Sequence, residues 1–289
     1  NRLYNGNDGG LYYTDNNGND WTQISSGLAI SQIYKMGSSA TVKELVINGY
    51  QDNGTATYTP DGWKTVMGGD GMDCLIDWED PSYSYGEYYY GAIDRIKNNS
   101  SNQGSIVNGI SEEGAWVTPY LLSHANSNTM FVGMKGVWRT NNVKATYTSQ
   151  VQWTKITEFS GSNCSMLVQS DANADILWVG KGSLIYITLD ANSENPSWNQ
   201  LSGLPGSGDI RSLATDPNDE DRVWMARGNE IFYSQDLCET WTNITGILPS
   251  IPMRSIVYYK NSVDGLYVGA EAGIYYRDAS LEDWVLYSE

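Results

Sequence analysis

One short phrase recurs seven times along this chain, and its anchor residue returns every 42 to 46 residues. The phrase runs from an aromatic or apolar stretch through a polar turn to a tryptophan, followed by Ile or Leu and then Ser or Thr. The anchors are Trp21, Trp63, Val107, Trp153, Trp198, Trp241 and Trp284, with Val107 in the slot that tryptophan fills elsewhere. A period in the forties, built of short apolar segments and turns, is the signature of a β-propeller blade. The repeat therefore predicts an all-β chain folded as a seven-bladed β-propeller of four-stranded antiparallel blades.

The sixth repeat predicts the four strands of one blade most clearly. They fall at 211–215, 222–226, 230–234 and 240–244, and each is short, rich in β-branched or aromatic residues and bounded by Gly, Pro, Asn or Asp. The third repeat is the weakest, and there the three tyrosines at 88–90 are assigned to the second strand. No segment has a convincing helical period.

The first repeat predicts an incomplete blade. Residues 2–4 already belong to its second strand, so its inner strand is absent from this chain. Because an open inner edge leaves backbone groups unpaired, we expect residues before Asn1, or another segment, to fill that place, as part of a longer protein. The even repeat has no linker, which predicts a single domain. Its blades are expected at about 1–27, 28–68, 69–115, 116–160, 161–205, 206–249 and 250–289.

The charge and the scarcity of metal ligands exclude several classes of function. With 17 Lys and Arg against 34 Asp and Glu, the formal net charge of -17 argues against nucleic acid, which requires a basic face. No apolar stretch approaches the roughly 20 residues of a membrane span. The single histidine, His124, cannot build a His-rich zinc site, and the three cysteines lie in different repeats without metal or disulfide spacing. We therefore expect free, buried thiols and no metal or cofactor.

Two of the predicted turns between third and fourth strands have a characteristic pattern. They lie at 234–241 (S-Q-D-L-C-E-T-W) and 14–21 (T-D-N-N-G-N-D-W). Both resemble a worn Asp-box, Ser/Thr-x-Asp-x-Gly-x-Thr-Trp, in which the carboxylate accepts N–H groups of the turn and Trp packs between sheets. The resemblance implies a structural role for Asp236. Asp15, Asn17 and Asn19 also suit a cation loop, but a hairpin turn is favoured because Gly18 is misplaced and no Glu closes the loop.

Six further phrases extend the resemblance over the whole chain. They lie at 7–12 (N-D-G-G-L-Y), 51–55 (Q-D-N-G-T), 68–72 (G-G-D-G-M), 114–119 (G-A-W-V-T-P), 265–269 (G-L-Y-V-G) and 273–278 (G-I-Y-Y-R-D). With them the sequence resembles secreted bacterial propellers of the sortilin/Asp-box (BNR) repeat superfamily, and is distantly similar to xyloglucan-cleaving glycoside hydrolases. The resemblance implies an exported, extracellular or cell-surface protein, of a kind often associated with type IX secretion and adhesion.

Short, Gly-lined loops place carboxylates on one face of the predicted propeller. Loops before the inner strand and loops after the second strand share that face, so Asp8, Asp52 and Asp70 are expected close together in neighbouring blades. Gln51 lies beside Asp52, and Trp116, which is not needed as a repeat anchor, is a candidate platform for stacking a ligand. The alternative is structural: the carboxylates cap backbone N–H groups, and Trp116 packs between blades.

The first residues of the inner strands form a second predicted ring, at the mouth of the central channel. Asp73 is expected there, across the channel from Arg211 and Arg254, which would bind an acidic ligand. The alternative is that each arginine simply pairs with an acidic neighbour.

Two functions from different classes fit this face. The preferred interpretation is a non-catalytic scaffold that binds polysaccharide, a surface protein or flanking domains of the same polypeptide. The alternative is a glycoside hydrolase of the endo-glucanase or xyloglucanase kind, with paired carboxylates drawn from Asp8, Asp52 and Asp70. Sialidase-like hydrolysis is disfavoured, because it needs three convergent arginines and only Arg211 and Arg254 stand at equivalent positions.

Overall fold

The computed structural model describes residues 2–7, 10–27, 31–157 and 159–287. In this part of the chain seven antiparallel sheets follow one another, one of three strands and six of four. Strands that are neighbours in a sheet are also consecutive in the chain, so each sheet is a meander. The single helical turn among the described residues is η1 (Thr148–Gln150). The chain is an all-β, seven-bladed propeller whose first blade lacks an inner strand.

Each blade runs from an inner strand A to an outer strand D, and the first blade begins at strand B. The first three blades consist of β1 (Leu3–Asn7), β2 (Gly10–Thr14) and β3 (Thr22–Gln23); β4 (Ile33–Ser38), β5 (Val46–Tyr50), β6 (Gly54–Thr59) and β7 (Gly62–Met67); and β8 (Cys74–Ile76), β9 (Tyr83–Glu87), β10 (Ile93–Lys97) and β11 (Ser101–Ser105). The fourth and fifth consist of β12 (Tyr120–Leu122), β13 (Met130–Gly133), β14 (Val137–Thr140) and β15 (Thr154–Lys155); and β16 (Met166–Gln169), β17 (Leu177–Lys181), β18 (Leu184–Thr188) and β19 (Asn199–Gln200). The sixth and seventh consist of β20 (Ile210–Thr215), β21 (Val223–Arg227), β22 (Glu230–Ser234) and β23 (Thr242–Asn243); and β24 (Met253–Tyr258), β25 (Leu266–Ala270), β26 (Gly273–Arg277) and β27 (Val285–Leu286).

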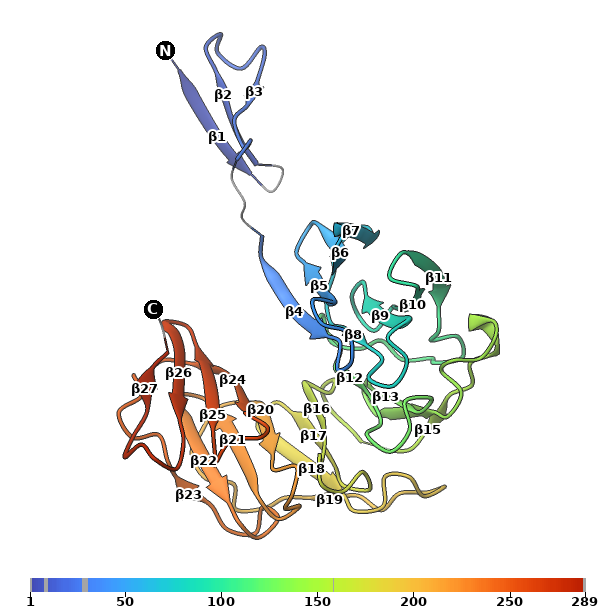
Figure 1. Cartoon of the computed structure of the whole chain (residues 1–289), viewed down its shortest axis with the longest axis vertical. Helices are drawn as coiled ribbons and strands as arrows, with labels where there is room; N and C mark the ends of the chain where they lie inside the picture. Colours follow the sequence, from blue (N-terminus) through green and yellow to red (C-terminus); the bar gives the residue numbers. More distant parts are fainter. Residues whose placement is uncertain (1, 8–9, 28–30, 158, 288–289) are drawn as a thin grey trace.

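Figure 1 shows the second to seventh blades arranged around an arc, while the first blade, β1–β3, stands apart from them. Along the arc, inner strands of neighbouring blades lie side by side, with β4 next to β8 and β20 next to both β16 and β24. This packing brings loops that are distant in the sequence to a common face. No helix among the described residues has the length and apolar character needed to cross a membrane.

Apolar side chains fill the space between neighbouring blades. Successive residues of a strand point to opposite faces of its sheet, so a blade inside the arc buries both faces against other blades. β17 shows this most fully, because it is buried along its whole length. Trp178, Tyr85 and Phe131 are among the largest side chains that are completely buried. The three thiols are free and buried, as expected.

The third blade departs from its expected layout at strand B. That strand is β9, and the three tyrosines at 88–90 form the turn that follows it rather than the strand itself. The backbone reverses here because Tyr90 and Gly91 adopt positive φ angles of 55° and 85°, and the N–H of Ala92 donates to the carbonyl of Tyr89. Tyr89 and Tyr90 therefore lie on a loop instead of being packed in a sheet.

Strand D of the third blade also lies earlier than expected. It is β11, reached from β10 through a tight turn in which Asn98 and Asn99 take positive φ angles. Val107 therefore follows strand D, whereas the equivalent tryptophan of the sixth blade directly precedes it. In that sixth blade β20, β21 and β22 begin and end within one residue of the expected strands.

Candidate functional site

Three inner strands begin with a β-bulge that takes one side chain out of the regular alternation. The register of strand A on strand B shifts at the start of β4, β20 and β24. The extra residues are Tyr34, Arg211 and Arg254. Because a bulge leaves a residue unpaired and redirects its side chain, these three residues are suited to contacts outside the sheet. Two of them are the arginines that the sequence predicts at the channel mouth.

Three aromatic side chains gather on the loops of the third and fourth blades. Trp116 lies in the loop before β12, and Tyr89 and Tyr90 lie in the turn between β9 and β10. The ring of Tyr89 stacks on Trp116 with centroids 5.4 Å apart and 3° between the planes, while Tyr90 meets Trp116 edge-on at 5.3 Å. Trp116 is 41% exposed, and both tyrosines are more exposed still. We call these three residues the aromatic platform, an exposed aromatic surface of the kind that marks ligand-binding faces.

Tyr34 joins the aromatic platform to the second blade. Its hydroxyl accepts the indole N–H of Trp116 at 3.2 Å and donates to the side-chain oxygen of Gln51, also at 3.2 Å. Gln51 and Trp116, both predicted as binding residues, are thus brought together by one hydroxyl group. The bulge at Tyr34 is what places that hydroxyl between them.

A buried carboxylate connects the two loops that carry the aromatic platform. Glu87 ends β9, is completely buried, and accepts the backbone N–H groups of Gly91 at 2.9 Å and Thr118 at 3.0 Å. Gly91 directly follows Tyr90, and Thr118 lies two residues after Trp116. Burial raises the pKa of Glu87 to about 7, although the two N–H bonds favour the ionised form.

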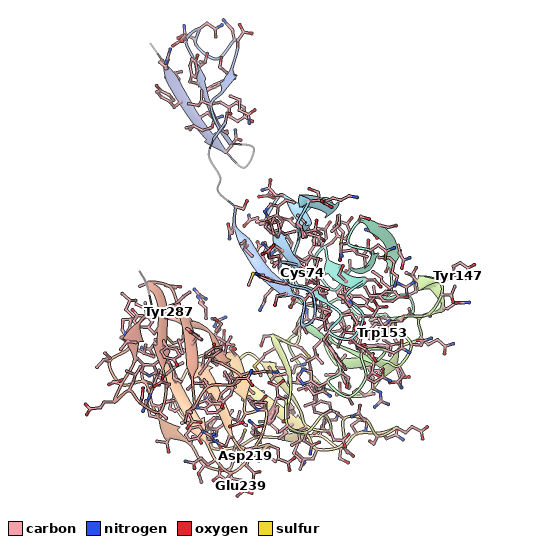
Figure 2. All side chains as sticks on the ribbon, in the orientation of Figure 1. Cys74, Tyr147, Trp153, Asp219, Glu239 and Tyr287 are labelled. Atoms are coloured by element: carbon pink, nitrogen blue, oxygen red, sulfur yellow. The ribbon has the colours of Figure 1, made fainter. Side chains whose placement is uncertain are left out.

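Asp73 lies beside Glu87. Its backbone N–H faces the Glu87 carboxylate at 3.4 Å, and its carbonyl accepts the hydroxyl of Tyr120 at 2.9 Å. Burial raises the pKa of Asp73 to about 6, against the opposing charge of Lys35 and the N–H that Cys74 donates to the carboxylate. Asp73 therefore retains its proton under mildly acidic conditions. Cys74, the next residue in the chain, is labelled in Figure 2.

Asp52 and Asp70 also lie together, in a tight pair of loops. Oδ1 of Asp70 accepts the backbone N–H of Asp52 at 2.8 Å, and Asp52 has a φ of 58°. The N–H of Gly54 donates to the carbonyl of Gly69 at 2.7 Å, which joins the same two loops. The carboxylate of Asp70 thus caps the backbone N–H of Asp52, while the side chain of Asp52 is exposed to solvent. The third carboxylate expected here, Asp8, lies outside the described residues.

Arg211 and Arg254 belong to the sixth and seventh blades and each has a local acidic partner. A guanidinium nitrogen of Arg211 is 3.3 Å from a carboxylate oxygen of Asp209, and Arg254 forms an ion pair with Glu271. All four side chains are about half exposed. In the described part of the chain neither arginine bridges to Asp73.

The turns between strands C and D use their polar side chains internally. Oδ1 of Asp236 accepts the N–H of Thr240 and the hydroxyl of Ser234, both at 2.8 Å. In the first blade Asn16 accepts the N–H of Asp20 and the hydroxyl of Thr14 in the same way. The arrangement is that of a hairpin turn held by one side-chain oxygen.

The described residues offer little other reactive chemistry. No group of three or more His, Cys, Asp or Glu side chains in them is arranged to hold a metal ion. Burial raises the pKa of each thiol, Cys74, Cys164 and Cys238, which disfavours the reactive thiolate. His124 lies in the turn between β12 and β13, with Nδ1 3.5 Å from a carboxylate oxygen of Asp171.

Four members of the site escaped the sequence reasoning: Tyr34, Glu87, Tyr89 and Tyr90. Tyr89 and Tyr90 were hidden by their assignment to a strand, although the glycine that follows them is a turn signal. An acidic residue at the end of an otherwise uncharged strand was the signal available for Glu87. Nothing in the sequence marks the bulge at Tyr34.

Comparison with known proteins identifies the fold but no family. The sequence matches no family model and none of the curated proteins. The structure is similar to an ancestral GH74 enzyme, with a TM-score of 0.70 and 12% sequence identity over 88% of this chain. It is also similar to the GH74 enzyme of Niastella koreensis, with a TM-score of 0.69 and 14% identity over 95% of this chain. The chain spans 38% of the first protein and 50% of the second.

Proposed function

We propose that this propeller is a carbohydrate-active protein of the glycoside hydrolase kind, which holds a polysaccharide chain on the aromatic platform. The observation that carries the proposal is the exposed, stacked pair of Trp116 and Tyr89, with Gln51 attached through Tyr34. A sugar ring packs its apolar C–H face on an aromatic ring, and its hydroxyl groups require polar partners at the edge of that ring. The fold similarity to two GH74 enzymes supports the same class.

Hydrolysis would use Asp73 as its acid. A glycosidase needs one carboxylic acid that protonates the leaving oxygen and a second carboxylate that acts as base or nucleophile. The raised pKa of Asp73, about 6, suits the first role because the proton stays on the carboxyl group at mildly acidic pH. Asp52, which is exposed, and Asp8 are the candidates for the base or nucleophile, since the carboxylate of Asp70 already caps a turn.

A non-catalytic glycan-binding scaffold is the second candidate. It is favoured by Asp70 and Glu87, whose carboxylates are both engaged with backbone N–H groups. In either case we place the protein outside the cell or on its surface, with polysaccharide or a surface protein as partner and no cofactor.

Titration with xyloglucan and mixed-linkage glucan oligosaccharides tests the aromatic platform. Trp116→Ala is expected to weaken binding about fivefold, because a stacked ring contributes on the order of 1 kcal/mol. Tyr147→Ala is the matched control, since Tyr147 is 66% exposed but lies at the outer edge of the fourth blade (Figure 2). Equal affinities for wild type, Trp116→Ala and Tyr147→Ala would refute the platform.

A reducing-sugar assay on the same polysaccharides separates the two candidates. Turnover that is lost in Asp73→Asn but retained in Asp236→Asn supports the hydrolase, because Asp236 serves only its turn. Binding by the wild type without release of reducing ends supports the scaffold. Turnover that survives Asp73→Asn, Asp52→Asn and Asp70→Asn alike would place the chemistry elsewhere.

A further inference from the structure

Neighbouring blades are joined by a hydrogen bond that repeats along the chain. The indole N–H of Trp153 in the fourth blade donates to the carbonyl of Ile106 in the third at 2.6 Å. Trp198 donates to Ile156 at 3.0 Å, and Trp284 to Ile244 at 2.7 Å, each reaching one blade back. Trp241 packs in the same core cluster as Leu201 of the preceding blade, without completing the bond among the described residues. The tryptophan before strand D is therefore a connector between blades.

Each acceptor occupies the same place in its own blade. The N–H groups of Ile106, Ile156 and Ile244 all donate to the first or second residue of strand C, which leaves their carbonyls directed at the next blade. Three further residues make this same N–H bond: Ile24 donates to Leu11 at 2.8 Å, Leu201 to Ile185 at 2.9 Å, and Tyr287 to Ile274 at 2.7 Å. By this equivalence the carbonyl of Tyr287 is an acceptor for the blade that follows the last one.

The last blade presents an apolar face that no other described blade covers. Its residues Val257, Tyr267, Ile274, Tyr276 and Tyr287 correspond in register to Ala214, Trp224, Ile231, Tyr233 and Ile244 of the sixth blade. Ile231 is 0% exposed against the seventh blade, whereas its counterpart Ile274 is 48% exposed. In Figure 1 the last blade ends the arc, and Figure 2 places Tyr287 at that free end.

The first blade carries the complementary unpaired residues. Trp21 directly precedes β3 as Trp284 precedes β27, but Trp21 is 44% exposed and Trp284 only 1%. Leu3 holds the register position of Leu266 and is 50% exposed, compared with 3% for Leu266. Among the residues that the structure describes, the indole of Trp21 donates to no carbonyl of another blade.

We infer that the first blade docks on this open face of the last blade, with the indole N–H of Trp21 donating to the carbonyl of Tyr287. The occupant is the β1–β3 sheet of the same molecule, because it carries a connector tryptophan of the kind that joins the fourth, fifth and seventh blades to their predecessors, together with exposed apolar residues. The same rule seats Trp63, 55% exposed in the second blade, on the carbonyl of Ile24, so that both sides of the first blade become buried. Docking closes the ring.

Oxidation of tryptophans by N-bromosuccinimide, read by mass spectrometry on the full chain, tests this docking. Trp21 and Trp63 are expected to react about tenfold more slowly than Trp116, because docking protects them in all but briefly opened molecules. Trp116 is the matched control, since its exposed fraction of 41% is close to the 44% of Trp21 in the open arrangement. Rates for Trp21 equal to those for Trp116 would overturn the proposal.

A variant on the open face distinguishes the docking surface from other sources of protection. Val257→Asp, which puts a charge on that face, is expected to raise the reaction rate of Trp21 to that of Trp116. Val263→Asp is the control, because Val263 is 76% exposed in a loop of the same blade. Protection of Trp21 that persists in Val257→Asp would show that the first blade docks elsewhere.

Light scattering gives the mass of the protein in solution and tests for a dimer. Protection of Trp21 found only in a dimer would mean that a second copy occupies the face, which also contradicts docking within one chain.

Discussion

Glu87, a buried residue of the candidate site, makes the stability of the folded chain depend on pH. Its pKa lies near 7 in the folded chain against 4.5 for an ordinary Glu, so the folded state retains a proton that the unfolded chain releases. The stability contributed by that proton is complete below about pH 4.5 and is lost as the pH rises through 7, a decline of roughly 3 kcal/mol. Glu87→Gln has no proton to lose, so its free energy of unfolding is expected to fall less between pH 5 and pH 8.

Urea unfolding at the two pH values measures this difference. Asp73, whose pKa is also raised, contributes a decline of the same sign to both proteins, so the comparison of variant with wild type is what isolates Glu87. Glu239→Gln, a change at an exposed Glu in a turn of the sixth blade, is the control and is expected to follow the wild type. Equal declines in wild type and Glu87→Gln would mean that Glu87 is already ionised at pH 5.

At the scale of one element, the turn between β22 and β23 depends on a single carboxylate. Asp236 accepts the N–H of Thr240 and the hydroxyl of Ser234, and Thr240 also bonds it through its side chain. Asp236→Ala leaves the turn N–H without its partner, and we expect the melting temperature to fall by about 2–4 °C. Glycan affinity should not change, because this turn lies at the opposite end of the strands from the B–C loops. Gln235→Ala, in the same turn and exposed, should melt like the wild type; an equal loss in both would assign the effect to the turn backbone.

The strands themselves were largely predictable from the sequence, and the failure in the third blade has a local cause. Strands of the sixth blade alternate or bury apolar residues between clear turn residues, so their bounds follow from the pattern. At 83–90 the run Y-S-Y-G-E-Y-Y-Y has β-forming tyrosines on both sides of Gly86 and Glu87, and propensity alone cannot decide which side belongs to the strand. The structure ends it at Glu87, whose carboxylate accepts the N–H of Gly91 in the following turn.

At the scale of the whole molecule, the fold predicted which loops meet but not which side chains pair. Gln51 and Trp116 do converge, through a hydroxyl that no local pattern indicates. Arg211 and Arg254 have acidic partners within their own blades, as the alternative to a shared acidic ligand expected. Choice of partner depends on distances of a few ångströms between loops, and a period of 42 to 46 residues does not determine distances at that scale.

The indole connectors imply that the blades of the arc unfold together. Trp284 is 1% exposed and bonds the carbonyl of Ile244, so Trp284→Phe removes one N–H and leaves both a gap and an unpaired buried carbonyl between two blades. We expect a loss of about 2 kcal/mol in the free energy of unfolding, with one transition and an unchanged dependence on urea, since the sixth and seventh blades share one apolar core. Trp116→Phe changes a tryptophan on the loop face and should unfold within about 0.5 kcal/mol of the wild type. Two separate transitions in Trp284→Phe would show instead that the last blade is held mainly by that one contact and melts independently of the others.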